Sequence, residues 1–177
     1  MAIKNNKEHQ IELLQANLQT IRKIAGWTIE EFGDKLGVSK QTISNLENGK
    51  TQMSLIQYIA IRAVLDYEIE EHPENEVLPK AIHLLLDEKK NLSEEDYEKV
   101  KQAIDTVAAA ASGGADETML SSLFTGMIGT IAAGIGIGLI SPLGIVGGVA
   151  SAFWFKSVMG KDKTIQYEEE ERREMFL

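Results

Sequence analysis

The spacing of apolar residues along the chain predicts a protein built from helices. In two long stretches, about residues 7–25 and 93–111, apolar residues recur three and four positions apart, which places them on one face of a helix. The stripe residues are Ile11, Leu14, Leu18, Ile21 and Ala25 in the first stretch, and Tyr97, Val100, Ile104, Val107 and Ala111 in the second. Shorter helices are predicted over about residues 28–36, 40–47, 55–65 and 79–90. We therefore predict an all-α fold.

Residues 28–50, TIEEFGDKLGVSKQTISNLENGK, predict two short helices joined by a tight turn. Thr28 and Glu31 have the three-residue spacing of a capping box at the start of the first helix. Gly37 follows as the stop of that helix, at a position where a left-handed backbone disfavours any residue with a Cβ. The second helix opens at Ser39 or Lys40, and Asn48-Gly49 ends it.

The outward face of this second helix carries side chains that suit hydrogen bonding to base edges in a DNA major groove. These candidate base contacts are Lys40, Gln41, Ser44 and Asn45. Side chains and helix-start amides around the same unit can hold phosphates. The candidate contacts to the DNA backbone are Thr28, Asn48, Lys50 and Thr51.

Residues of this unit match a known pattern. The matching residues are the run from Trp27 through Leu36, then Gly37-Val38-Ser39, Thr42-Ile43-Ser44 and Leu46-Glu47-Asn48-Gly49-Lys50. They resemble the helix-turn-helix of the Xre/Cro-type phage repressor family over roughly residues 13–65. One departure is Gly33, where the family usually carries Ala. We expect glycine to fit there, at a cost of about 1 kcal/mol in helix propensity.

The resemblance implies a sequence-specific regulator of double-stranded DNA, most often a repressor. It implies two copies of the unit on two half-sites about one helical turn apart. It also implies an ion pair between Arg22 and Glu47, which would tie the first helix to the second helix of the unit and orient the scaffold. The alternative is that Arg22 and Glu47 are two unrelated charges on the surface.

Charge and composition restrict this interpretation. The net charge of −9 opposes binding to a polyanion, so DNA affinity must come from a local patch. Residues 1–66 are near neutral, with eight Lys or Arg against seven Asp or Glu. The chain has no cysteine, its three histidines have no metal-ligand spacing, and no nucleophile motif is present. We expect no catalytic residue, metal or cofactor.

The chain is predicted to divide into five segments. They are a DNA-binding domain at 1–66, an acidic linker at 67–78, a helical pair at 79–112 with a role in dimerisation, a glycine-rich hydrophobic segment at 116–160 and a charged tail at 161–177.

The run from Thr118 to Phe155 contains no charged residue. Its first part, 120–140, is long enough to span the hydrocarbon of a bilayer as a helix, and Ser141-Pro142 breaks it. Three interpretations compete: a membrane hairpin, a single span, or a soluble core of close-packed glycine helices. Lys156 and the lysines beyond it favour the hairpin over the single span.

Two functions from different classes follow. The first is a cytoplasmic DNA-binding regulator that forms a homodimer or higher homo-oligomer through its C-terminal half. The second is an interaction protein at the inner face of the membrane, held there by residues 118–158, which uses the helix-turn-helix to tether DNA or a partner protein.

Overall fold

A computed structural model of the chain describes residues 2–135, and within this range the protein consists of helices and short connections. The α-helices are α1 (Ala2–Ile24), α2 (Ile29–Leu36), α3 (Lys40–Glu47), α4 (Leu55–Glu71), α5 (Val77–Ile82), α6 (Glu94–Ser112) and α7 (Glu117–Ile135). Between α5 and α6 lie a π-helical turn, η1 (His83–Asp87), and a 3-10 turn, η2 (Lys89–Asn91). The predicted all-α class is confirmed for this part of the chain.

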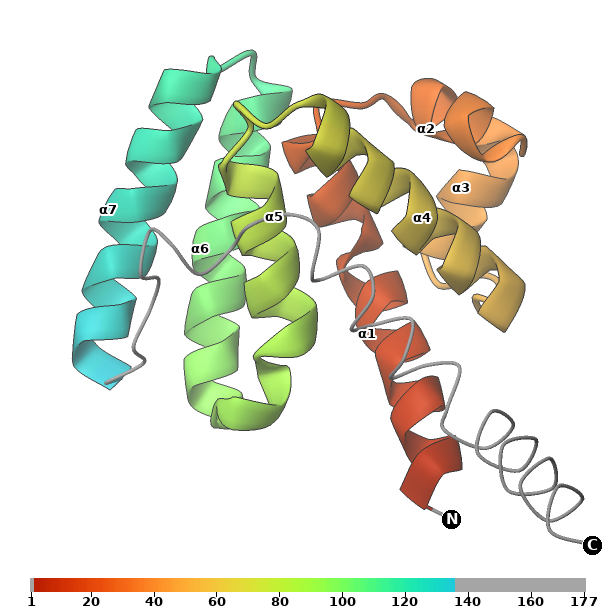
Figure 1. Ribbon diagram of the computed structural model, residues 1–177, viewed down its shortest axis with the longest axis horizontal. Helices are drawn as coiled ribbons and strands as arrows, with labels where there is room; N and C mark the ends of the chain where they lie inside the picture. The colour runs from red at the N-terminus through yellow and green to blue at the C-terminus, as the bar shows by residue number, and fades with distance from the viewer. Residues whose placement is uncertain (1, 136–177) are drawn as a thin grey trace, which may run out of the picture.

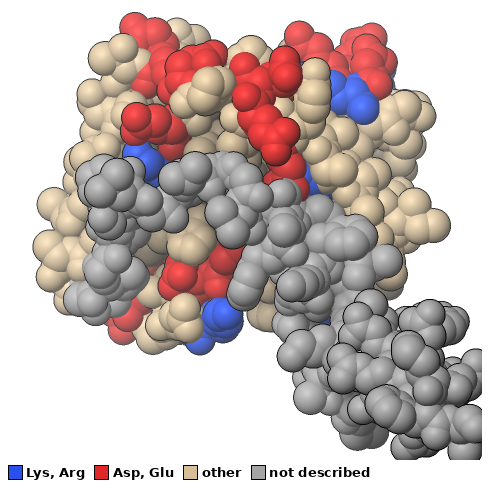
Figure 2. All heavy atoms as spheres, in the orientation of Figure 1, with Lys and Arg blue, Asp and Glu red and all other residues tan. Residues whose placement is uncertain are grey.

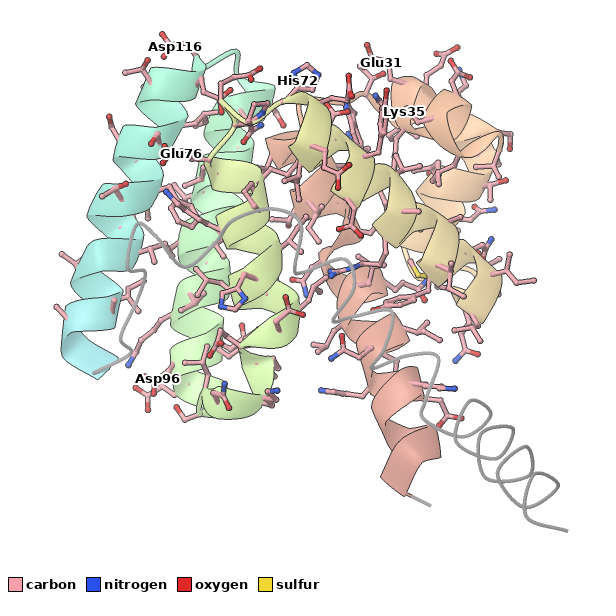
Figure 3. All side chains as sticks on the ribbon, viewed as in Figure 1. Glu31, Lys35, His72, Glu76, Asp96 and Asp116 are labelled. Carbon is pink, nitrogen blue, oxygen red and sulfur yellow. The ribbon has the colours of Figure 1, made fainter. Side chains whose placement is uncertain are left out.

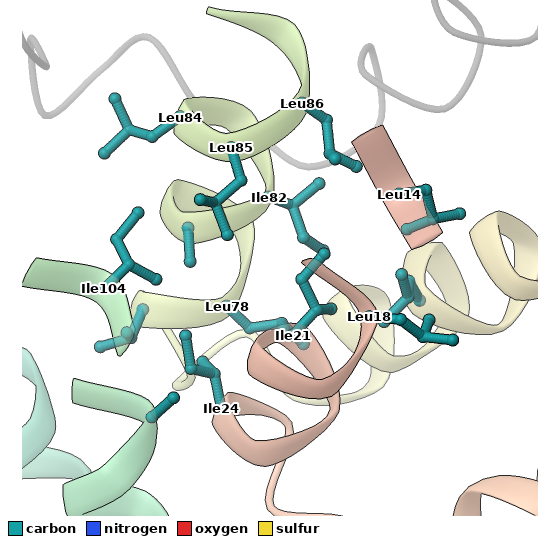
Figure 4. Packing of buried hydrophobic residues seen from close by; sticks show 14 of the residues in the cluster. Leu14, Leu18, Ile21, Ile24, Leu78, Ile82, Leu84, Leu85, Leu86 and Ile104 are labelled. Atoms are coloured by element: carbon teal, nitrogen blue, oxygen red, sulfur yellow. The ribbon is translucent and has the colours of Figure 1, made fainter. Parts of the chain in front are cut away.

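Helix α1 is the central element of the fold (Figure 1). It begins at Ala2, five residues before the predicted start, and it contacts α3 and α4 on one side and α5, η1 and α6 on the other. Its stripe residues Leu14, Leu18 and Ile21 are buried. Figure 4 shows Ile21 beside Leu78 and Ile82 of α5. One hydrophobic core therefore joins the first four helices to the later ones.

The α2–α3 unit forms as its local sequence predicts. The backbone N–H of Glu31 donates to Thr28 Oγ1 at 3.1 Å, and the Thr28 N–H donates to Glu31 Oε2 at 2.7 Å. Gly37 ends α2 with φ +67°, in the left-handed region. Ser39 is the N-cap of α3 and accepts from the Thr42 N–H at 3.2 Å.

Helix α4 is longer than its apolar pattern predicts. It runs to Glu71, so five residues of the predicted acidic linker are helical. Helix α5 begins at Val77, two residues before the predicted start at Pro79. The side chain of Asn75 accepts from the Leu78 N–H at 2.9 Å and so fixes this earlier start. The predicted helix over 79–90 is also interrupted after Ile82 by η1 and η2.

The apolar stripe of α6 is covered within the same chain. Val100, Ile104 and Val107 are fully buried, and α6 packs against α1 and α7. Asn17 of α1 donates to the Tyr97 hydroxyl at 3.0 Å, and that hydroxyl donates to the Leu85 carbonyl at 3.2 Å. A dimer contact through the helical pair would therefore need a surface other than this stripe.

The first part of the uncharged run forms α7. Leu120, Phe124, Ile128 and Ala132 recur every four residues and are buried. Helix α7 packs on α6 and also contacts α5. Within residues 2–135, none of the helices has both the length and the hydropathy needed to cross a bilayer. The predicted bend at Ser141-Pro142, the lysines after Phe155 and the charged tail lie outside the described residues.

Candidate nucleic-acid interface

The candidate base contacts lie together on the solvent side of α3. Lys40 and Gln41 are exposed, and Ser44 and Asn45 are half-buried. The opposite face of α3 is anchored by Ile43 and Leu46, whose exposed fractions are 0% and 2%. Because these anchors are in the core, α3 presents its polar side chains from a fixed support.

An amide pair preorganises part of this face. The Gln41 Nε2 group donates to Asn45 Oδ1 at 2.9 Å, one helical turn apart. Glutamine and asparagine side chains can each donate and accept a hydrogen bond at once. The pair therefore holds two amides side by side while leaving further donors and acceptors for base edges.

The loop after α3 carries the other candidate contacts. Asn48, Lys50 and Thr51 are exposed. Gly49 has φ +64° and reverses the chain directly after α3. The Asn48 side chain donates to the Ser44 carbonyl at 2.7 Å and so closes the end of the helix. Thr28, by contrast, lies at the start of α2, beside the exposed carboxylates of Glu30 and Glu31, which oppose a phosphate at that point.

Gln15 of α1 holds this loop, a role that its local sequence does not indicate. Its amide nitrogen donates to the carbonyls of Leu46 at 3.0 Å and Thr51 at 2.7 Å. Its amide oxygen accepts from the Met53 N–H at 2.8 Å. A lone polar residue on the flank of an apolar stripe gives no signal of this role in a single sequence, because its three partners are more than 30 positions away.

Arg22 and Glu47 form the ion pair that the resemblance implies. The guanidinium is bidentate, with Nε 2.5 Å from Oε1 and Nη2 3.1 Å from Oε2 of the carboxylate. Nη1 donates to the Trp27 carbonyl at 2.7 Å. Both side chains are almost fully buried. The pair thus ties α1, the start of the α2–α3 unit and the end of α3 to one another.

Acidic side chains gather along the upper edge of the molecule (Figure 2). Figure 3 shows His72, Glu76 and Asp116 along the upper edge of the molecule, where α4 ends and α7 begins, and Figure 2 shows that edge lined with acidic groups. A hydrogen bond to Glu74 and the nearby charge of Glu68 raise the pKa of His72. This acidic edge is unfavourable for contact with a polyanion.

The part of the chain that the structure describes has no candidate metal site. Among residues 2–135, no group of three or more His, Cys, Asp or Glu side chains has a geometry that could hold a metal ion.

Comparison with known families decides what this arrangement is. Residues 18–72 match the family model described as Helix-turn-helix. This part of the chain is thus similar to the Xre/Cro-type helix-turn-helix family. A search of curated proteins and a search of solved structures each found no significant match to the chain.

The matched family is one of DNA-binding transcription regulators, so the helix-turn-helix domain supports a DNA-binding function. Its matched range starts within α1 and ends at the last turn of α4. Helices α5, α6 and α7 lie beyond it: α5 and α6 pack on α1, and α7 packs on α6 and α5.

Proposed function

We propose that the protein is a sequence-specific regulator that binds double-stranded DNA as a dimer, with α3 in the major groove. The observation that supports this most is the polar face of α3, held by Ile43 and Leu46 in the core and by the Arg22–Glu47 pair at its end. Lys40, Gln41, Ser44 and Asn45 contact bases in this proposal. Asn48, Lys50 and Thr51 contact the DNA backbone, and Thr28 is the weakest of the backbone contacts.

The test is selection of a preferred site from a random pool of duplex DNA, followed by affinity measurements. Gln41→Ala should weaken binding to the selected site by about 1–3 kcal/mol and relax sequence preference at one base pair. Gln102→Ala, which changes an exposed glutamine of α6, is the matched control and should bind normally. Unchanged affinity in Gln41→Ala would show that α3 does not lie in the groove as proposed.

Lys50→Ala separates backbone contact from base contact. The variant should weaken binding to all sequences about equally, and the slope of log affinity against log salt should fall by about one. Lys90→Ala removes an exposed lysine of η2 on the far side of the molecule and serves as control. A loss confined to one base pair in Lys50→Ala would contradict the backbone role.

Repression is the proposed outcome of binding, because a bound dimer occupies DNA that other proteins need. A reporter placed behind the selected site should be expressed less in cells that contain the protein. Higher expression in those cells would show activation instead.

A second candidate concerns the uncharged run, which continues for twenty residues beyond α7. This run favours a regulator attached to the inner face of the membrane. Flotation of the full chain with liposomes tests this, and a chain ending at Ile135 is the control, since it keeps α7 on the bundle. Flotation of the full chain alone supports attachment, and flotation of neither excludes it.

A further inference from the structure

Helix α4 is apolar on both of its faces. Tyr58, Ile61 and Leu65 point inward and are fully buried. The outward face is also apolar, although surface helices usually carry polar residues there. Its residues are Ile56, Ala60, Ala63 and Tyr67, and the neighbouring Ile59 and Val64 are partly buried against the core. The exposed fraction is 80% for Ile56 and 60% for Tyr67, Ala63 is exposed and Ala60 is half-buried, so most of this face is accessible to solvent.

Charged residues are kept off this face. Between Ile56 and Tyr67 the charged residues of α4 are Arg62, which is buried, and Asp66, which is half-buried. In Figure 2 the surface over α4 towards α3 is mostly neither acidic nor basic, unlike the upper edge. Contiguous exposed apolar surface of this kind marks an interaction site.

The order of large and small side chains suits a second copy of the chain. Ile56 and Tyr67 stand at the two ends of the face, and the small residues Ala60 and Ala63 lie midway between them. Two antiparallel copies that cross at the alanines would place Ile56 of each copy against Tyr67 of the other. A two-fold contact requires this kind of self-complementarity, in which residue i meets j and j meets i.

Charge also favours the antiparallel arrangement. Glu68, Glu70 and Glu71 make the C-terminal end of α4 acidic. Parallel helices would bring the two acidic ends together, whereas antiparallel helices hold them apart and align their dipoles favourably. We propose that the outward face of α4 is the contact of a homodimer, formed by two antiparallel α4 helices.

The role of this contact in DNA binding rests on the proposed function. The existence of the dimer contact does not depend on that function. Helix α4 starts four residues after Thr51, so pairing of two α4 helices would join two candidate DNA-contacting loops. A contact of three helical turns buries less surface than the roughly 1,200–2,000 Å² that stable complexes bury. The free dimer should therefore be weak and should be tightened by DNA that carries two half-sites.

Engineered cysteines test the contact directly, because the chain has none of its own. Full-length Ile56→Cys and Tyr67→Cys proteins, mixed and mildly oxidised, should form a mixed disulfide dimer. Each variant alone should cross-link poorly, since about 16 Å of helix separates the two positions. Ala109→Cys, on an exposed site of α6, is the matched control. Efficient self-cross-linking of Tyr67→Cys, or a mixed yield no higher than for Ala109→Cys, would overturn the proposal.

Ala63→Glu tests the consequence for DNA. Because Ala63 is exposed, the variant should fold normally, which circular dichroism checks. It should bind a DNA with one half-site as wild type does and lose at least tenfold in affinity for two half-sites. Ala109→Glu should behave as wild type. Equal affinity of Ala63→Glu and wild type for two half-sites overturns the α4 contact. If cross-linking succeeds but wild type selects no DNA site, the dimer stands and the proposed function fails.

Discussion

Gly33 lies where the turn between α2 and α3 folds back on α2. A Cβ at this position would be 2.7 Å from the Val38 carbonyl oxygen, a distance that forces the backbone to move. The Val38 N–H also donates to the Gly33 carbonyl at 2.9 Å. Helix propensity alone predicts that glycine is tolerated here at a cost, but the closeness of the turn makes glycine the residue that fits.

Gly33→Ala should therefore lower the free energy of unfolding by about 1–3 kcal/mol, because the strain of overpacking exceeds the gain in helix propensity. Gly126→Ala is the matched control, since a Cβ there meets nothing within 4 Å. That control should be neutral or should stabilise α7 by up to about 1 kcal/mol. Chemical denaturation measures the free energy of unfolding of both variants. Stabilisation by Gly33→Ala would show that the turn moves away at no cost.

Arg22 and Glu47 form a buried ion pair, so we expect their contributions to stability to depend on each other. Arg22→Met leaves the Glu47 carboxylate buried without its partner and should cost about 3–5 kcal/mol of stability. The double change Arg22→Met with Glu47→Leu removes both charges and should cost clearly less than the single change. A double-mutant cycle of unfolding free energies measures the difference. Additive losses would contradict a coupled buried pair.

The irregular segment after α5 combines buried leucines with a histidine that lies between two carboxylates. In η1 the three leucines Leu84, Leu85 and Leu86 are all buried. His83 at its start has Nδ1 3.6 Å from Asp87 and Nε2 3.3 Å from Glu88. The close Asp87 carboxylate, together with the charge of Glu88, raises the pKa of His83 and outweighs the opposing effect of partial burial.

A raised histidine pKa means that the folded state holds the proton more tightly than the unfolded state does. The stabilisation is complete below the ordinary histidine pKa of about 6.5 and is lost as the pH rises through the folded value. The stability difference between wild type and His83→Gln should therefore be largest at acidic pH and shrink above it. Urea unfolding at a series of pH values measures this. A difference that does not change with pH would argue against the charge effect.

At the scale of the whole molecule, α1 belongs to two packing surfaces at once. It supports α3 through Gln15 and Arg22, and it supports α6 through Asn17 and through Thr20, whose hydroxyl donates to Asp105 at 2.5 Å. The core is continuous across these surfaces. This favours cooperative unfolding, whereas the predicted division near residue 66 favours separate units.

Ile104→Ala in α6 distinguishes cooperative unfolding of the whole bundle from unfolding as separate units. The change should cost about 2–5 kcal/mol. Trp27 in the helix-turn-helix domain is the reporter, in a Trp154→Phe background that leaves it as the sole tryptophan. One cooperative unit predicts that the transition followed by Trp27 fluorescence shifts by the full amount. An unshifted transition would support independent domains.

The sequence by itself determined the local structure of this protein. The capping box at Thr28, the left-handed Gly37 and the buried stripes of α1 and α6 follow from patterns within a few residues, because backbone hydrogen bonds and helical spacing are local. The outward position of Gln41 followed in the same way. The resemblance, rather than spacing, supplied the pairing of Arg22 with Glu47.

Only the tertiary structure decided which surfaces meet. An apolar stripe shows that a face is buried but not against what, because the hydrophobic effect has no direction. The α6 stripe therefore suggested a second copy, whereas it packs on α1 of the same chain. The bonds of Gln15 and the open outer face of α4 likewise depend on residues far apart in sequence, which the folded chain brings together.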